Sequence, residues 1–352
     1  MRFFFYYFSI DRPSGGLKQI RLQSHLLQQL GVSVYLLRER AVDGKNDVFD
    51  DNVFYNLPVM EAPFAFDEAD NYLSKDDILI LPEYDLQRLL AMVKNCPARI
   101  GVNNQNGFYA LYFRPKLREL KSRIEFSMAC SPFAAITSHR CYGMKWKNIF
   151  QTPYWMVRPP FDQGRSSTDS QLSICYMPRK IETITHQVME KVKLKFPSVP
   201  WIPIDNMSED EVADYLRGNQ IFFSAQDQEG FGMPALEAMI CGCLVAGFGG
   251  TGRFPHPYVS RGNGCWAHDR NVDQAVKAVC DAITLCQEKG SKYQQIIANA
   301  QVTAARFTEE QASRALREML DVIGNKSYDN RQVDPPSLGI VGWFQMARYL
   351  RR

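Results

Sequence analysis

The feature that most constrains the fold is the regular alternation of short, continuous apolar runs with stretches of helical periodicity. In the first half, apolar runs predict strands at residues 2–9, 32–37, 77–81, 99–102 and 126–130, and a leucine-rich stripe predicts a helix at 15–30. Strands that are apolar throughout and separated by helices are typical of a parallel sheet covered on both faces. The sequence therefore predicts an α/β protein with doubly wound sheets.

The chain of 352 residues has room for two such units, because domains usually hold about 100–200 residues. The pattern pauses at residues 157–170, where prolines, a glycine and small polar residues predict a linker. It then restarts, with strands expected at 172–177, 199–204, 220–224 and 243–247, and helices at 182–195, 208–217 and 233–241. We expect a first domain at 1–160 and a second at 171–330.

Composition excludes several classes of protein. The 41 basic and 38 acidic residues nearly balance, so the chain lacks the basic excess of a nucleic-acid-binding protein. The nine cysteines are scattered without a CxxC pair, which argues against zinc and redox motifs and favours thiols in a reducing cytoplasm. Asp11 and Arg12 end the apolar N-terminal run, so we interpret it as a first strand rather than a signal peptide. No apolar run reaches about 18 residues, so we expect a cytoplasmic protein with at most peripheral contact to the inner face of a membrane.

The most informative motif lies at residues 224–252 and follows an expected strand. The loop Gln228–Gly232 contains two glycines, which let a backbone approach a ligand closely, and Pro234 suits the first position of a helix. A loop that leads into a helix N-terminus is an anion site suited to phosphate. Glu229 and Glu237 are eight residues apart and are expected to point into the same cleft, where a carboxylate can accept hydrogen bonds from the hydroxyls of a sugar.

The run EGFGMPALEAMICG closely resembles the signature of retaining glycosyltransferases with the GT-B fold, specifically glycosyltransferase family 4. Glu229 and Glu237 match the E-x7-E pattern of that family. The resemblance implies two Rossmann-like domains facing a cleft, the second of which binds a nucleotide diphosphate sugar. It also implies transfer of the sugar, with retention, to an acceptor hydroxyl in glycan or polysaccharide biosynthesis.

The same resemblance implies roles for individual residues. Glu229 would contact hydroxyls of the donor sugar, and Glu237 the donor ribose. The backbone near the start of the helix would bind sugar and phosphate, at Gly230, Phe231, Gly232, Met233 and Pro234.

Two adjacent cations, Arg179 and Lys180, follow the first strand of the second half. They resemble the donor-binding Arg and Lys of the family, although those are commonly a few residues apart, and a solvated basic turn is the alternative. Cations here would stabilise the charge of a diphosphate leaving group. Because there is no DxD triplet to hold a divalent cation, we expect neither a metal nor another cofactor.

The first half offers weaker candidates. Gly15 and Gly16 follow the first strand and resemble the N-terminal glycine loop of the family, which lies over the donor phosphates or near the acceptor. Where many members have a histidine, this chain has amides, which bind hydroxyls but do not act as general bases near neutral pH. These acceptor-side candidates are Asn103, Asn104, Gln105 and Asn106, with His139 as a further one for which a packing role is the alternative. Glu83 ends a strand, and Gly249–Gly252 either bring amides to the donor or form a turn.

Several alternatives stay open at this point. A GT-B epimerase or phosphorylase would share the donor motif, and a non-catalytic sugar- or nucleotide-binding scaffold would share the fold. A nicotinamide dehydrogenase is disfavoured because no GxGxxG follows the first strand. The acceptor is left open as a glycan such as a polysaccharide, a lipid-linked glycan, a protein or a small molecule. A last amphipathic helix at 337–352 is expected to cross back to the first domain as in the GT-B fold, in preference to touching a membrane.

Overall fold

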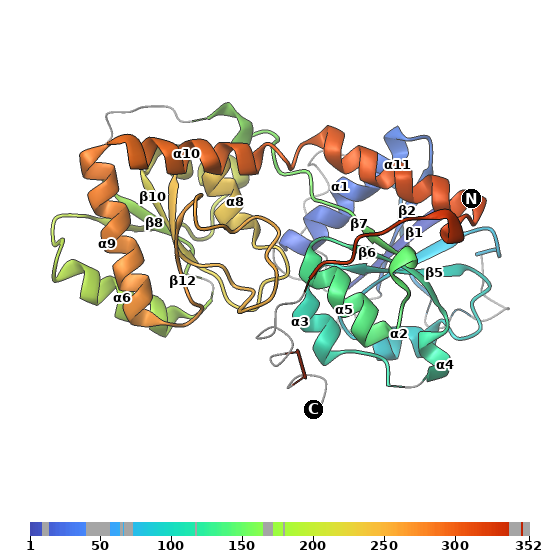
Figure 1. Ribbon diagram of the computed structural model, residues 1–352. Coiled ribbons are helices and arrows are strands. Elements are labelled where there is room, and N and C mark those ends of the chain that lie inside the picture. Colours follow the sequence, from blue (N-terminus) through green and yellow to red (C-terminus); the bar gives the residue numbers. More distant parts are fainter. Residues whose placement is uncertain are drawn as a thin grey trace. The chain divides into compact units, whose positions relative to one another are not determined.

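The computed structural model describes residues 1–8, 14–39, 57–63, 66, 73–116, 118–164, 172–178, 180–337 and 346–347. The chain forms two compact units (Figure 1). Unit 1 comprises Met1–Tyr154 and Glu310–Arg352, and unit 2 comprises Trp155–Glu309.

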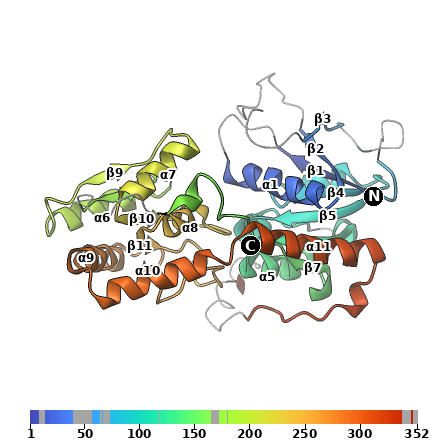
Figure 2. The ribbon, with the colours of Figure 1, turned by 90° about the horizontal axis from the view of Figure 1, so that it is seen from above.

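The described part of unit 1 contains a seven-stranded parallel sheet in the order β3-β2-β1-β4-β5-β6-β7, part of which can be followed across Figure 2. Its strands are β1 (Arg2–Tyr7), β2 (Ser33–Arg38), β3 (Val59–Glu61), β4 (Ile78–Pro82), β5 (Arg99–Asn104), β6 (Ile124–Ala129) and β7 (Ile149–Gln151). The central strands β1 and β4 are buried almost throughout, because helices cover both faces of the sheet.

The helices of unit 1 follow the strands and cover this sheet. They are α1 (Gly15–Gln29), α2 (Leu86–Met92), α3 (Gly107–Tyr112), α4 (Arg118–Lys121), α5 (Pro132–Tyr142) and α11 (Glu309–Asn325), with short 3-10 turns at Trp146–Asn148 and Tyr328–Asn330. Helix α1 begins at the glycine pair and buries the predicted stripe, including Leu26 and Leu27. The doubly wound pattern predicted for the first half is confirmed.

The described part of unit 2 has a five-stranded parallel sheet in the order β12-β11-β10-β8-β9. Its strands are β8 (Ile174–Tyr176), β9 (Trp201–Pro203), β10 (Ile221–Ala225), β11 (Leu244–Phe248) and β12 (Cys265–Ala267). Its helices are α6 (Glu182–Lys193), α7 (Glu209–Gly218), α8 (Met233–Ile240), α9 (Val272–Glu288) and α10 (Ser291–Ala304), with a 3-10 turn at Phe161–Gln163. Alternate residues of β10, Ile221 and Phe223, share one core cluster with apolar residues of α6 and α9.

The boundaries between the units differ from those expected. The first falls at Tyr154, and residues 310–330, expected in the second domain, belong to unit 1. The reason lies in the contacts of α11 and the segment after it: Arg99 donates a hydrogen bond to the carbonyl of Ile323 (3.0 Å), and the Tyr328 hydroxyl contacts Glu125 (2.6 Å). The return to the first domain therefore begins with α11.

The expected helix at 337–352 lies mostly outside the described residues. Within it, Met346 and Ala347 are helical, and Met346 is buried. All nine cysteines are free thiols, and most are buried. In the part of the chain that the structure describes, no helix combines the length and apolar character needed to cross a membrane.

Candidate active site

The sheet of unit 2 has a switch point next to its first strand. β8 lies between β9 and β10 in the sheet. The chain passes from β8 to β9 on one side and then returns to β10 on the other side, so the order of the strands reverses at β8. In open parallel sheets, ligands bind in the crevice outside the carboxyl ends of the strands at such a point. The loops that follow β8 and β10 carry Lys180 and Glu229, the two candidates that the sequence singled out.

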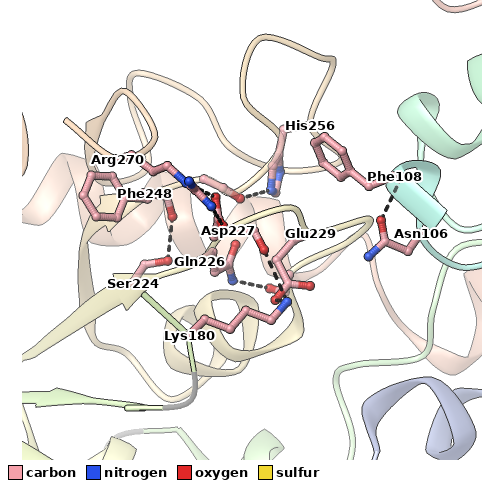
Figure 3. Close-up of polar contacts among 12 residues, drawn as sticks. Asn106, Phe108, Lys180, Ser224, Gln226, Asp227, Glu229, Phe248, His256 and Arg270 are labelled. Carbon is pink, nitrogen blue, oxygen red and sulfur yellow. Dashed lines mark hydrogen bonds and ion pairs between the residues drawn. The ribbon is translucent and has the colours of Figure 1, made fainter. Parts of the chain in front are cut away.

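Lys180 and Glu229 form an ion pair across this switch point (Figure 3). The Lys180 Nζ lies 2.8 Å from Oε1 of Glu229 and 3.3 Å from the carbonyl oxygen of Asp227. The side chains are 44% and 23% exposed, respectively, so both stay accessible to a ligand. Arg179 lies outside the described residues, and its role stays a prediction.

The loop of Gly249–Gly252 holds Glu229 in position. The backbone N–H of Glu229 donates to the carbonyl of Gly250 (2.9 Å). Gly250 has a φ of +86°, and a Cβ there would lie 2.8 Å from Cβ of Gln226 and 3.0 Å from Cγ of Glu229, so this position requires glycine. The N–H groups of Gly250 and Gly252 both donate to the carboxylate of Asp269, at 3.0 and 2.5 Å. Because Asp269 occupies these amides, the loop acts as a turn and does not offer them to a donor.

A second constrained backbone segment opens α8. Gly232 precedes the helix with a φ of +81°, and a Cβ there would collide with the side-chain amide of Gln226. Its carbonyl accepts hydrogen bonds from the Gln226 amide (2.9 Å) and from the Tyr258 hydroxyl. The helix has Pro234 in its first turn and no side-chain cap at its N-terminus. Such a terminus presents its positive dipole end to an anion.

The remaining residues of the motif are more buried. The Phe231 ring packs edge to face against Tyr258 and Phe307, so only its backbone is suited to a donor. Glu237 is buried in α8. Burial raises the pKa of the Tyr258 phenol, and the charges of Glu229 and Glu237 raise it further. The charges of the two glutamates therefore both act on the same phenol, and their shared role at one site stays a prediction.

Several polar residues of this region carried no recognisable signal in the sequence. Asp227 forms a two-point ion pair with Arg270, and Nε of Arg270 lies 2.9 Å from Oδ1 (Figure 3). Burial lowers the pKa of His256 to about 3. Its Nδ1 accepts from the N–H groups of Tyr258 and Val259, so Nε2 carries the proton that is donated to the carbonyl of Gly249 (3.0 Å). The neutral side chain of His256 thus stabilises the loop Gly249–Gly252.

Two of the acceptor-side candidates of unit 1, Asn103 and Asn104, are buried in its core. Asn103 and Asn104 are successive residues of β5, so their side chains point to opposite faces of the sheet. Nδ2 of Asn103 donates to Gln23 of α1 (2.9 Å), and Nδ2 of Asn104 donates to the carbonyl of Ala134 in α5 (2.8 Å). Both are almost fully buried, so the expected hydroxyl-binding role is corrected: they tie helices to the sheet.

Replacing Asn104 by Ala therefore tests a structural role. The Asn104 amide also contacts the hydroxyls of Thr137 and Ser138, and its loss leaves buried groups unpaired. We expect a loss of about 2 kcal/mol in the free energy of unfolding, measured by urea denaturation. Asn325→Ala, at an exposed position at the end of α11, serves as the control and should change little. An Asn104→Ala protein as stable as wild type would contradict this assignment.

Of the other candidates of unit 1, Gln105 and Asn106 directly follow β5, whereas His139 lies in α5. Nε2 of Gln105 donates to the carbonyl of Gly16 (3.0 Å), which joins the end of β5 to the glycine pair at Gly15. Asn106 caps α3 by accepting from the N–H of Phe108 (3.0 Å; Figure 3). His139 lies apart from them.

The His139 ring faces the turn after α5 rather than the end of β5. Its Nδ1 lies 2.7 Å from the carbonyl of Met144, and the ring stacks on Trp146 with centroids 4.5 Å apart. These contacts support the packing role of His139, and its acceptor-side assignment stays a prediction.

Glu83 follows β4 and is buried at the carboxyl edge of this sheet. Burial raises its pKa to about 7, and hydrogen bonds from the backbone N–H groups of Gln105 and Asn106 moderate this effect. Burial is the main cause of the raised pKa of Tyr142, Tyr154 and Cys130, and the charge of Glu83 adds to it for each of them.

This raised pKa makes the stability of the protein pH-dependent. Between pH 4.5, the ordinary pKa, and about 7, Glu83 is ionised in the unfolded chain but protonated in the folded one. The free energy of unfolding therefore falls as the pH rises through this window, by about 3 kcal/mol relative to Glu83→Gln. Urea denaturation of both proteins at the two ends of the window measures this difference. A difference that is independent of pH would contradict the raised pKa.

Among the described residues, no three His, Cys, Asp or Glu side chains gather as metal ligands would. Comparison with known proteins identifies the class to which the fold and site belong. Residues 202–330 match the family described as Glycosyl transferases group 1. An alpha-1,6-glucosyltransferase of Actinobacillus pleuropneumoniae serotype 7 (strain AP76) is 25% identical over 290 residues, which cover 79% of this chain and 82% of that protein.

Two solved structures share the fold over nearly their whole length. The pneumococcal O-GlcNAc transferase GtfA, in complex with UDP and GlcNAc, matches with a TM-score of 0.65 at 11% identity, over 92% of this chain and 99% of that chain. Anabaena Alr3699/HepE, in complex with UDP and glucose, matches with a TM-score of 0.63 at 13% identity, over 91% and 99%.

The fold is thus that of the GT-B glycosyltransferases, as the resemblance predicted, and the family match and the relative support a glycosyltransferase. More particularly, residues 202–330, which carry Glu229 and Glu237, are similar to the group 1 glycosyl transferases.

Proposed function

We propose that this protein is a retaining glycosyltransferase that moves a sugar from a nucleotide diphosphate donor to an acceptor hydroxyl in glycan biosynthesis. The single observation that carries the proposal is the Lys180–Glu229 ion pair at the switch point of unit 2. It combines a cation suited to a diphosphate with a carboxylate suited to sugar hydroxyls, beside a helix N-terminus without a side-chain cap.

The proposed donor is a UDP-sugar, with UDP-glucose as the first one to test. The 25% identical relative is a glucosyltransferase, and two structures that share the fold hold UDP, one of them with glucose. In this arrangement Glu237 binds the ribose and Glu229 binds the hydroxyls of the sugar. Lys180, Arg179 and the backbone at Gly230–Pro234 bind the diphosphate.

The proposed chemistry needs no base from the protein. The bond between the anomeric carbon and the β-phosphate oxygen breaks, and the acceptor oxygen bonds to the same face of that carbon. The leaving phosphate oxygen takes the proton of the acceptor hydroxyl, so the charge that Lys180 must stabilise is that of the departing diphosphate. Because this cation and Arg179 supply the positive charge, we expect transfer to continue in the presence of a chelator. The cytoplasmic location is part of this proposal, and the free thiols support it.

A thermal-shift screen tests donor binding before any acceptor is known. UDP, GDP, ADP, dTDP and CDP, with their common sugar conjugates, are added with and without EDTA. A ligand that binds only the folded protein raises its free energy of unfolding and therefore its melting temperature. At a ligand concentration of 100 Kd the free energy of unfolding rises by about 2.7 kcal/mol. We expect a shift with UDP that EDTA does not remove. If no nucleotide shifts the well-folded protein, the proposal fails and a non-catalytic scaffold becomes the better account.

A further inference from the structure

Unit 1 exposes a group of aromatic side chains at its own switch point. β1 and β4 are neighbours in the sheet although β2 and β3 separate them in sequence, so the crevice outside their carboxyl ends is a binding position. Phe8 follows β1 and Tyr84 follows β4. Their rings meet edge to face, with centroids 5.4 Å apart and an interplanar angle of 85°.

Two rings of the α3 segment extend this pair. The Tyr84 ring lies 5.6 Å from that of Tyr109, at 79°, and 4.5 Å from that of Phe113, at 58°. We call Phe8, Tyr84, Tyr109 and Phe113 the aromatic platform. Tyr84 is 45% exposed and Tyr109 is 42% exposed. Clustered exposed aromatic rings on a soluble fold mark interaction sites more often than scattered ones do.

The buried Glu83 fixes the two halves of the platform to each other. It stands next to Tyr84 in the loop between β4 and α2, and its carboxyl group accepts from the backbone N–H groups of Gln105 and Asn106. Asn106 in turn caps α3, which carries Tyr109. The rings are therefore held by a preformed loop pair, and a ligand need not order them on binding.

The chemistry of the platform fits one kind of ligand. Tyrosine rings are apolar on their faces and polar at their tips, and the half-buried amides of Gln105 and Asn106 follow the adjacent strand β5. A pyranose ring has the complementary character, because its C–H groups form an apolar face and its hydroxyls form a polar rim. A lipid tail is instead bound best by a predominantly apolar groove.

We propose that the aromatic platform binds the acceptor of this enzyme as a carbohydrate chain, with a pyranose ring stacked on Tyr84 or Tyr109. This inference rests on the proposed function for its biological sense, but the binding itself does not require catalysis. It selects a glycan from the acceptor classes that the sequence left open.

The test measures oligosaccharide binding directly. Short soluble oligosaccharides of glucose, galactose, mannose and N-acetylglucosamine are titrated into the full chain with UDP present, and their binding is followed by saturation-transfer NMR. We expect at least one to bind, and Tyr84→Ala and Tyr109→Ala to weaken it about tenfold or more. Tyr109→Phe, which keeps the ring, should retain most of the affinity. Tyr215→Ala removes a tyrosine of similar exposure, 40%, from unit 2 and should have no effect.

The outcomes separate this inference from the proposed function. If UDP raises the melting temperature but no oligosaccharide binds, or if the Ala variants bind as well as wild type, the platform proposal is overturned and the donor proposal stands. If phosphatidylglycerol vesicles bind through the same tyrosines and oligosaccharides do not, the platform is a lipid contact and the proposal is also overturned. Oligosaccharide binding without any nucleotide shift would support the platform and contradict the donor site.

Discussion

Replacing Glu229 by Gln is expected to lower kcat/KM for sugar transfer by about 10² to 10³, with little change in melting temperature. The substitution removes the negative charge that pairs with Lys180 while keeping the size of the side chain. A carboxylate that accepts sugar hydroxyls in a partly desolvated site contributes most when charge develops in the transition state, and the loss of one such group typically has this magnitude. The backbone N–H bond from Glu229 to Gly250 is unaffected, so the loop should keep its conformation.

Glu190→Gln is the matched control for this prediction. Glu190 is an exposed glutamate of α6 in the same unit, and its substitution should leave transfer unchanged. Rates are measured over a range of donor concentrations, so that kcat and the KM for the donor are obtained separately and a change in donor affinity alone can be recognised. Near wild-type transfer by Glu229→Gln would contradict the role assigned to this carboxylate.

Replacing Lys180 by Met should lower kcat by about 10², with a smaller effect on the KM for the donor. The ammonium group contacts Glu229 and the carbonyl of Asp227 at the end of β10, where the diphosphate is proposed to lie. Its charge is needed most when the diphosphate departs, so its loss should act on the transition state more than on donor binding. Lys180→Arg keeps the charge and should recover part of the rate, although its planar group has a different reach.

Lys191→Met controls for the loss of an exposed ion pair as such. Lys191 pairs with Asp273 at 2.7 Å, on the surface of the same unit, and such pairs contribute little to stability. A Lys180→Met protein whose kcat equals that of Lys191→Met would show that the Lys180 charge has no part in the reaction.

The sequence was sufficient for the elements that follow local rules. Continuous apolar runs identified β1, β4 and β10, because a strand buried on both faces is apolar over most of its length. The proximity of Lys180 and Glu229 could also be expected from the sequence, since both follow strands of one parallel sheet and such strands end at the same edge.

Other features depended on contacts that no local pattern encodes. The edge strands β3, β7 and β12 span three residues each, too few for a period to be read. Asp269 and His256 hold the loop Gly249–Gly252 through hydrogen bonds that span 19 and 7 residues, and no local sequence pattern predicts such contacts. Asn103 and Asn104 were misread because their position after an apolar strand suggested a site. In the structure they are still within β5, and their side chains point into the two faces of the sheet.

The most direct test of the central claim is time-resolved NMR of donor turnover by the wild-type chain. UDP-glucose is incubated with the protein in the presence of EDTA, first with water as the acceptor and then with any oligosaccharide that binds, and the anomer of the first product is recorded. The account predicts release of UDP together with an α-configured product, formed about 10² to 10³ times more slowly by Glu229→Gln. A β-configured first product would contradict retention, and no consumption of UDP-glucose or any other nucleotide sugar would contradict the assignment as a glycosyltransferase.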